Sequence, residues 1–137
     1  MIRKLFIISL IWALLILILC AIPGGSLPRV SFFNIPNFDK YVHAGLYFPL
    51  AFFLCAEFDL TKKTIFQLSG PLLTMLIVAF YGGLIEILQD KLFINRSAEL
   101  MDFFADLIGG LAGLTIYYLF FRPFFHKLLD RKKQLPD

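Results

Sequence analysis

The chain is short, apolar and weakly basic: of its 137 residues 59% are hydrophobic and seventeen are Phe, and the formal net charge is +3. The mean hydropathy is +0.79. Soluble domains usually contain about 45–50% apolar residues, so this composition excludes an ordinary soluble domain and indicates an integral membrane protein. The sequence also lacks the alternation of polar and apolar residues that strands show, which favours an all-helical bundle.

Four apolar stretches are each about long enough to cross a bilayer. A spanning helix takes about 20 apolar residues, which predicts helices over about 5–22, 41–57, 68–89 and 102–121. The first stretch follows Arg3 and Lys4 as a secretory signal would, but its uncharged run exceeds the usual 7–15 residues or so and favours a retained helix. We therefore expect one transmembrane domain over residues 1–137, with a basic cytoplasmic tail over 122–137.

The distribution of Lys and Arg predicts the orientation of this domain. Nine of these residues fall on the side of the two termini and four on the opposite side. Cytoplasmic loops carry the excess of Lys and Arg, so we expect both termini to be cytoplasmic. The basic residues near the membrane are then attracted to anionic lipid heads, and no nucleic-acid partner is needed to explain them.

Polar side chains gather at the outward-facing end of the predicted helices, where the second and fourth begin and the third ends. A carboxylate toward the bilayer centre costs on the order of 2–3 kcal/mol unless it is paired or faces water. We therefore expect these side chains to face one another and form a pocket, and we expect no comparable group at the cytoplasmic end. The candidate binding residues are Asp39, Lys40, His43, Glu86, Gln89, Arg96, Asp102 and Asp106.

Several of these residues also have purely structural interpretations. Asp39 lies one turn from His43 and can cap the second helix, orient His43, or do both. Glu86 can form an interhelical salt bridge to Arg96 or Lys40. For these residues the sequence leaves both interpretations open.

The start of the fourth predicted helix combines two acids with a stripe of small residues. Asp102 can be an ordinary helix-terminal acid, because the helix dipole favours an anion there. Asp106 lies in line with Gly109 and Gly113, a stripe that lets another helix approach closely, so we expect Asp106 to face protein. The Gly109/Gly113 face predicts either a tight crossing within the chain or a contact in a homo-oligomer.

In order and spacing, the polar residues resemble the motifs of the VanZ-like membrane proteins. The resemblance covers Asp39, Lys40 and His43, then Glu86 and Gln89, then Arg96, then Asp102 and Asp106, between about Phe38 and Gly113. At the last motif position the family usually has Asn where this chain has Asp106. The resemblance implies a multi-pass protein of a bacterial inner membrane, a role at the cell envelope and a link to resistance against the glycopeptide teicoplanin.

Two functions from different classes fit these residues. A binding protein would hold a membrane lipid, a lipid-linked envelope precursor or a lipid-like antibiotic, with Arg96, Lys40 and protonated His43 on anionic or carbonyl oxygens. An intramembrane enzyme would use His43 or Glu86 as a general base on a lipid head group, with Arg96 and Lys40 stabilising developing negative charge.

We expect no cofactor and no metal centre. His43, Glu86, Asp102 and Asp106 include suitable ligands for a divalent ion, but one histidine is few for zinc, and Lys40 already supplies positive charge. Ion translocation would need ionisable groups that continue inward, and none follows until the far side of the membrane.

Overall fold

The computed structural model describes residues 2–23, 36–61, 64–93 and 97–134, with side chains described between residues 4 and 128 of these ranges. Every regular element in these ranges is helical. The elements are α1 (Ile2–Ala21), α2 (Phe38–Asp59), α3 (Thr64–Lys91), α4 (Leu100–Ile116), the π-helical segment η3 (Tyr117–Phe121) and α5 (Arg122–Gln134).

The prediction of an all-helical protein with four potential spans is confirmed. Within the described ranges, four helical stretches are long and apolar enough to cross a membrane, and the last runs from Leu100 to Leu128 through η3 into α5. Each helix begins a few residues before the predicted apolar stretch, because a helix continues through polar residues of its first turn that a hydropathy criterion leaves out. Residues 122–134, predicted as part of a tail, are helical and continue directly from η3.

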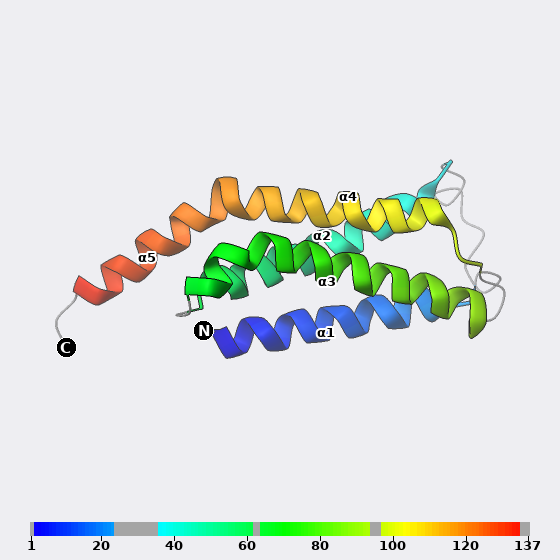
Figure 1. The fold of residues 1–137 in the computed structure, drawn as a ribbon, viewed down its shortest axis with the longest axis horizontal. Helices are drawn as coiled ribbons and strands as arrows, with labels where there is room; N and C mark the ends of the chain where they lie inside the picture. The colour runs from blue at the N-terminus through cyan, green and yellow to red at the C-terminus, as the bar shows by residue number, and fades with distance from the viewer. Residues whose placement is uncertain (1, 24–35, 62–63, 94–96, 135–137) are drawn as a thin grey trace.

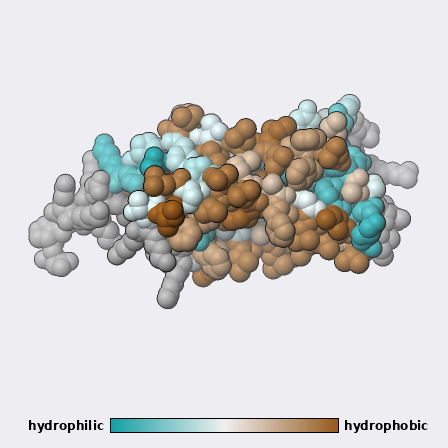
Figure 2. Space-filling view, viewed as in Figure 1, coloured by the Kyte–Doolittle hydropathy of each residue, from teal (hydrophilic) through white to brown (hydrophobic). Residues whose placement is uncertain are grey.

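The helices run alternately up and down (Figure 1). We call the end where α2 and α4 begin and α3 ends the cluster end, and the opposite end, where α1 begins and α2 ends, the termini end. In the hydropathy view the middle of the visible face is apolar, and hydrophilic residues gather toward both ends (Figure 2). This distribution is the one expected of a bundle whose middle lies in hydrocarbon.

Helix α4 packs very closely against α2 through its glycines. A Cβ atom at Gly109 would overlap the backbone carbonyl oxygen of Ala44, and a Cβ atom at Gly113 would overlap that of Phe48. The expectation of a tight helix crossing at this stripe is therefore confirmed. Within the chain, α2 occupies the Gly109/Gly113 face, and a homo-oligomer stays a prediction.

Helix α1 is attached to the bundle by hydrogen bonds as well as by apolar packing. The Trp12 Nε1–H donates to the Leu46 carbonyl of α2 at 2.7 Å, and the Tyr81 hydroxyl of α3 donates to the Ala13 carbonyl at 2.5 Å. The main core lies beside these bonds and includes Ile16, Cys20, Tyr47, Leu50, Ala51, Leu54, Val78 and Ile85. Helices α2 and α3, which carry part of the polar side chains, are thus both bonded to α1.

Candidate functional site

The rim of the site is built around Lys40. The Lys40 ammonium donates to Asp39 at 3.0 Å, to Glu99 at 2.9 Å and to Asp102 at 3.0 Å. Asp102 is buried, whereas the Asp39 and Glu99 side chains are 44% and 51% exposed. One cation from α2 therefore joins the start of α4 to the start of α2, and its three donors are all directed at carboxylates.

Below this rim lies a buried pair formed by His43 of α2 and Asp106 of α4. The Nδ1 atom of His43 is 2.9 Å from Oδ1 of Asp106, and the two residues are 5% and 0% exposed. The other ring nitrogen, Nε2, lies 4.0 Å from Oδ2 of Asp102. The carboxylate that holds His43 thus belongs to Asp106. Asp39, for which an orienting role on His43 was one prediction, bonds to Lys40 instead.

Glu86 reaches the same region from α3. Its Oε2 atom accepts a hydrogen bond from the backbone N–H of Glu99 at 2.8 Å, which ties the end of α3 to the residue that precedes α4. Glu86 is 6% exposed. Among the described residues neither Oε1 of Glu86 nor Oδ2 of Asp106 has a hydrogen-bond partner, although both atoms are buried. Buried polar atoms are normally paired, so these two unpaired oxygens mark the region as a candidate site.

The structure places the remaining predicted residues differently. Gln89 is buried, but its side-chain amide donates to the Cys20 carbonyl of α1 at 3.4 Å, so it contacts α1. Arg96, which was predicted to bind an anionic group, lies outside the described residues. Six predicted residues therefore meet at the cluster end: Asp39, Lys40, His43, Glu86, Asp102 and Asp106.

Gly82 makes room for the buried carboxylate of Asp106. A Cβ atom at Gly82 would lie 2.7 Å from Oδ2 of Asp106, too close to be accommodated without a shift. The neighbouring Gly83 has a different environment, because a Cβ there would meet only Phe103 at 3.8 Å, an ordinary contact distance. The site therefore depends on one glycine of α3 facing α4.

Two contributors were not predicted from the sequence. Glu99 supplies both a carboxylate for Lys40 and a backbone donor for Glu86. It lies three residues before Asp102 and seven before Asp106, a helical spacing that could have placed all three on one face. Tyr47 is fully buried one turn beyond His43, and among the described residues its hydroxyl has no partner.

The buried residues of the site could hold a cation. One ligand atom each from His43, Glu86 and Asp106 lies within 4.8 Å of the others, and the three come from different helices. Asp39, Glu99 and Asp102 form a second such group, and Lys40 already serves as its cation. Imidazole and carboxylate ligands together suit several divalent metals, so this capacity belongs to the inner group.

A polar cluster at the termini end contradicts the expectation that this end has nothing comparable. Asp59, the last residue of α2, is 1% exposed. It accepts hydrogen bonds from Tyr117 at 3.0 Å, Arg122 at 3.0 Å and His126 at 2.7 Å. This contact was not predicted, because residues 122–137 were expected to form a tail. The four-residue spacing of Arg122 and His126 is nevertheless that of one helix face.

Comparison with known proteins found no family model, no curated protein and no solved structure that matches this chain.

Proposed function

We propose that the cluster end binds the polar head group of a membrane lipid, a lipid-linked precursor or a lipid-like molecule of the bacterial cell envelope. The observation that carries the proposal is the pair of buried carboxylate oxygens, Glu86 Oε1 and Asp106 Oδ2, that lack partners among the described residues. Leaving such an atom unsatisfied costs about 1–3 kcal/mol, and a ligand that donates hydrogen bonds would recover this energy.

The charge of the site favours a ligand group that is cationic or rich in hydroxyls. In the described part of the cluster, five carboxylates (Asp39, Glu86, Glu99, Asp102 and Asp106) face one lysine and one histidine. Lys40 is already shared among three of these acids at the rim. Three carboxylates thus share Lys40 at the rim, and two more, Glu86 and Asp106, lie deeper beside His43, so an ammonium or hydroxyl donor would be stabilised at either level.

We propose that the chain is a member of the VanZ-like family and, as the family name implies, is linked to glycopeptide resistance. The support is the order and spacing of the motif residues, together with the meeting of Lys40, His43, Glu86 and Asp106 from three helices. Teicoplanin is lipophilic, as a ligand of a site within the membrane would be. A test is the teicoplanin sensitivity of a susceptible bacterium producing wild-type or His43→Gln protein, and equal sensitivity of both strains with an empty-vector strain would contradict the link.

We also propose that the protein lies in a bacterial inner membrane, as the resemblance to the VanZ-like family implies. Its cluster end would face outward and its termini would lie in the cytoplasm, because Lys and Arg are in excess at the termini end. The test uses single cysteines at exposed Leu92 and Leu128 in a chain whose own two cysteines are replaced. A membrane-impermeant thiol reagent added to intact inner-membrane spheroplasts should label position 92 and leave position 128 unlabelled. The reverse pattern would overturn this orientation.

A second candidate function is an intramembrane enzyme that acts by general acid and base chemistry. It is favoured by the 2.9 Å contact between His43 and Asp106, because a carboxylate on one ring nitrogen orients the imidazole and stabilises its protonated form. His43 would take a proton at Nε2 from water or from a substrate hydroxyl, and Lys40 at the rim would stabilise negative charge.

One experiment distinguishes binding from catalysis. Untargeted lipid mass spectrometry is performed on purified protein and on membranes from cells producing wild-type, Glu86→Gln or His43→Gln protein. The matched control is Asp90→Asn, which alters a half-exposed acid of the same helix paired with Lys91. A lipid enriched by wild type and Asp90→Asn but depleted from Glu86→Gln, with unchanged membrane composition, supports binding. A lipid species converted only in cells with wild-type or Asp90→Asn protein supports the enzyme, and no enrichment or conversion contradicts both.

A further inference from the structure

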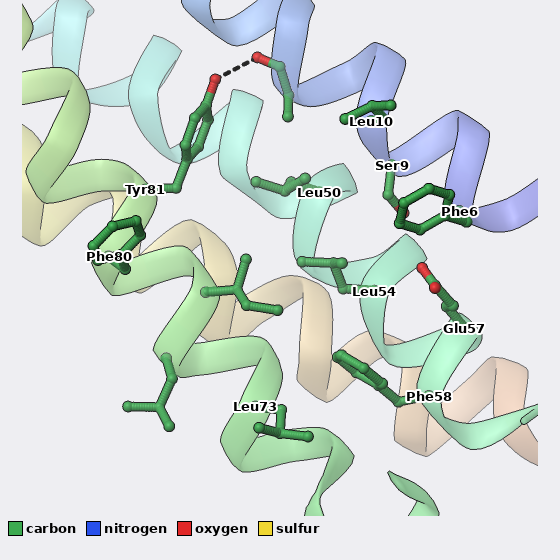
Figure 3. A pocket seen from close by; sticks show the side chains of 13 residues that line it. Phe6, Ser9, Leu10, Leu50, Leu54, Glu57, Phe58, Leu73, Phe80 and Tyr81 are labelled. Carbon is green, nitrogen blue, oxygen red and sulfur yellow. Dashed lines mark hydrogen bonds between the residues drawn. The ribbon is translucent and has the colours of Figure 1, made fainter. Parts of the chain in front are cut away.

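A groove separate from the cluster end opens on the side of the bundle between α1, α2 and α3. Its volume is about 510 Å³. Figure 3 shows its walls, with Leu10 and Ser9 on α1, Leu50, Leu54 and Glu57 on α2, and Leu73 and Phe80 on α3. Several residues of its lining are exposed at the protein surface, among them Phe6, Leu10, Leu76 and Phe80. In a bilayer this opening faces the lipid chains.

The groove contains two polar groups where an apolar lining would suffice. Ser9 is 5% exposed, and Glu57 lies across from it on α2. Within the described ranges, neither the Ser9 hydroxyl oxygen nor Oε2 of Glu57 has a hydrogen-bond partner, and both atoms are buried. A serine in a membrane helix usually bonds to a carbonyl of its own helix. Two unpaired acceptors in one groove point to a bound donor.

The position of these groups matches a lipid head rather than a chain. Glu57 is two residues before Asp59, the end of α2, so it lies near the membrane interface at the termini end. Leu50, at the other end of the groove, is seven residues away, which is about 10 Å along a helix. A lipid whose head meets Glu57 would thus place its chain along Leu54 and Leu50.

We propose that this groove binds phosphatidylethanolamine, with the ammonium on Glu57 and Ser9 and one acyl chain along the apolar walls. The primary ammonium carries N–H donors and a positive charge, and both are complementary to a carboxylate in a region of low dielectric. Phosphatidylcholine has the same charge but no N–H donor, and phosphatidylglycerol has hydroxyl donors but no positive charge. The proposal does not depend on the function proposed for the cluster end.

The test is native mass spectrometry of the full chain in detergent with an equimolar mixture of the three phospholipids, all with the same acyl chains. Wild-type protein should retain phosphatidylethanolamine about tenfold more than either other lipid, as expected for one charge-assisted hydrogen bond. Glu57→Gln should reduce this preference to about twofold or less, and Ser9→Ala should reduce it in part. Equal retention of all three lipids by wild type, or an unchanged preference in Glu57→Gln, would overturn the proposal.

Two further variants separate the groove from the rest of the surface. Ala13→Phe places a ring in the groove and should lower the retention of phosphatidylethanolamine, whereas Ala112→Phe, on an exposed face of α4, should retain it. Retention is compared only at temperatures where each variant remains folded, and Glu57→Gln decides the result if Ala13→Phe does not fold. Glu86→Gln should leave the preference unchanged, so failure of this proposal and failure of the proposed function give different results.

Discussion

His43 and Asp106 are 63 positions apart in the chain, yet Nδ1 of His43 lies 2.9 Å from Oδ1 of Asp106 in the most buried part of the cluster. The crossing of α2 and α4 is therefore defined by this polar contact as well as by the close packing at Gly109 and Gly113. A buried pair of this kind is sensitive to the loss of either member, because the remaining group is left without a partner away from water.

Asp106→Ala should lower the stability of the protein by about 1–3 kcal/mol, since His43 loses the acceptor for its Nδ1–H. Asp106→Asn keeps an oxygen at the same place and should retain most of the stability. Thermal unfolding in detergent, followed by circular dichroism or scattering, measures both effects. If the alanine and asparagine variants were equally unstable, the hydrogen bond to His43 would not be what Asp106 contributes.

Gly109→Ala should be strongly destabilising, because its methyl group would overlap the Ala44 carbonyl and push α4 away from α2. Overpacking usually costs about 1–3 kcal/mol, and a backbone neighbour leaves little room for relief. The matched control is Gly45→Ala on α2, where a Cβ would meet nothing within 4 Å. The midpoint of thermal unfolding should fall for Gly109→Ala and stay the same or rise for Gly45→Ala; equal midpoints would argue against the close crossing.

Gly82→Ala should disturb the proposed binding site more than it disturbs the fold, because its Cβ atom would lie 2.7 Å from Oδ2 of Asp106 and displace that carboxylate. We expect this variant to lose the lipid that the wild-type protein enriches. Its free energy of unfolding should fall by no more than about 1–3 kcal/mol. Gly83→Ala is the control at the next position of α3. Normal lipid enrichment in Gly82→Ala would show that the position of Asp106 is not critical for the ligand.

Asp59→Ala should release the start of α5 from the end of α2, since Tyr117, Arg122 and His126 all lose their shared acceptor. The buried Tyr117 hydroxyl would be left unpaired, at a cost of about 1–3 kcal/mol. Limited proteolysis with trypsin should cut faster after Lys127 in this variant. The control is Asp90→Asn, which changes a half-exposed acid at the other end of the bundle, and equal cutting rates in the two variants would contradict the role of Asp59.

The fold was largely predictable from the sequence, because the four apolar stretches have the length of membrane helices and their spacing leaves short connections. Most residues of the cluster, though not Glu99, were predictable because ionisable groups such as Glu86 and Asp106 are costly beside lipid unless they meet partners. The pairing within the cluster was not. Helical spacing put Asp39 on the same face as His43, but the contact made by His43 depends on how α4 crosses α2, which Gly109 and Gly113 determine.

The contacts of Asp59 could not be predicted from the sequence for a different reason. Arg122 and His126 follow an apolar stretch and precede further basic residues, so charge alone assigned them to a tail near lipid heads. Nothing local indicates that the helix continues through Tyr117–Phe121 and brings these side chains back to Asp59. A long-range contact of a charged helix can be seen only once the end of α2 and the path of α4 are known.

The π-helical segment η3 joins α4 directly to α5. The direction in which the α5 side chains point therefore depends on the number of residues in this segment. In an α-helix each residue advances the face by about 100°, so one residue more or fewer between Gly113 and Arg122 would rotate α5 by that angle and turn Arg122 and His126 away from Asp59. The exposed positions of this segment, Leu119 and Phe120, should therefore tolerate changes of side chain more readily than the segment tolerates changes of length. Insertions and deletions should therefore be accepted after His126 more readily than between Gly113 and His126.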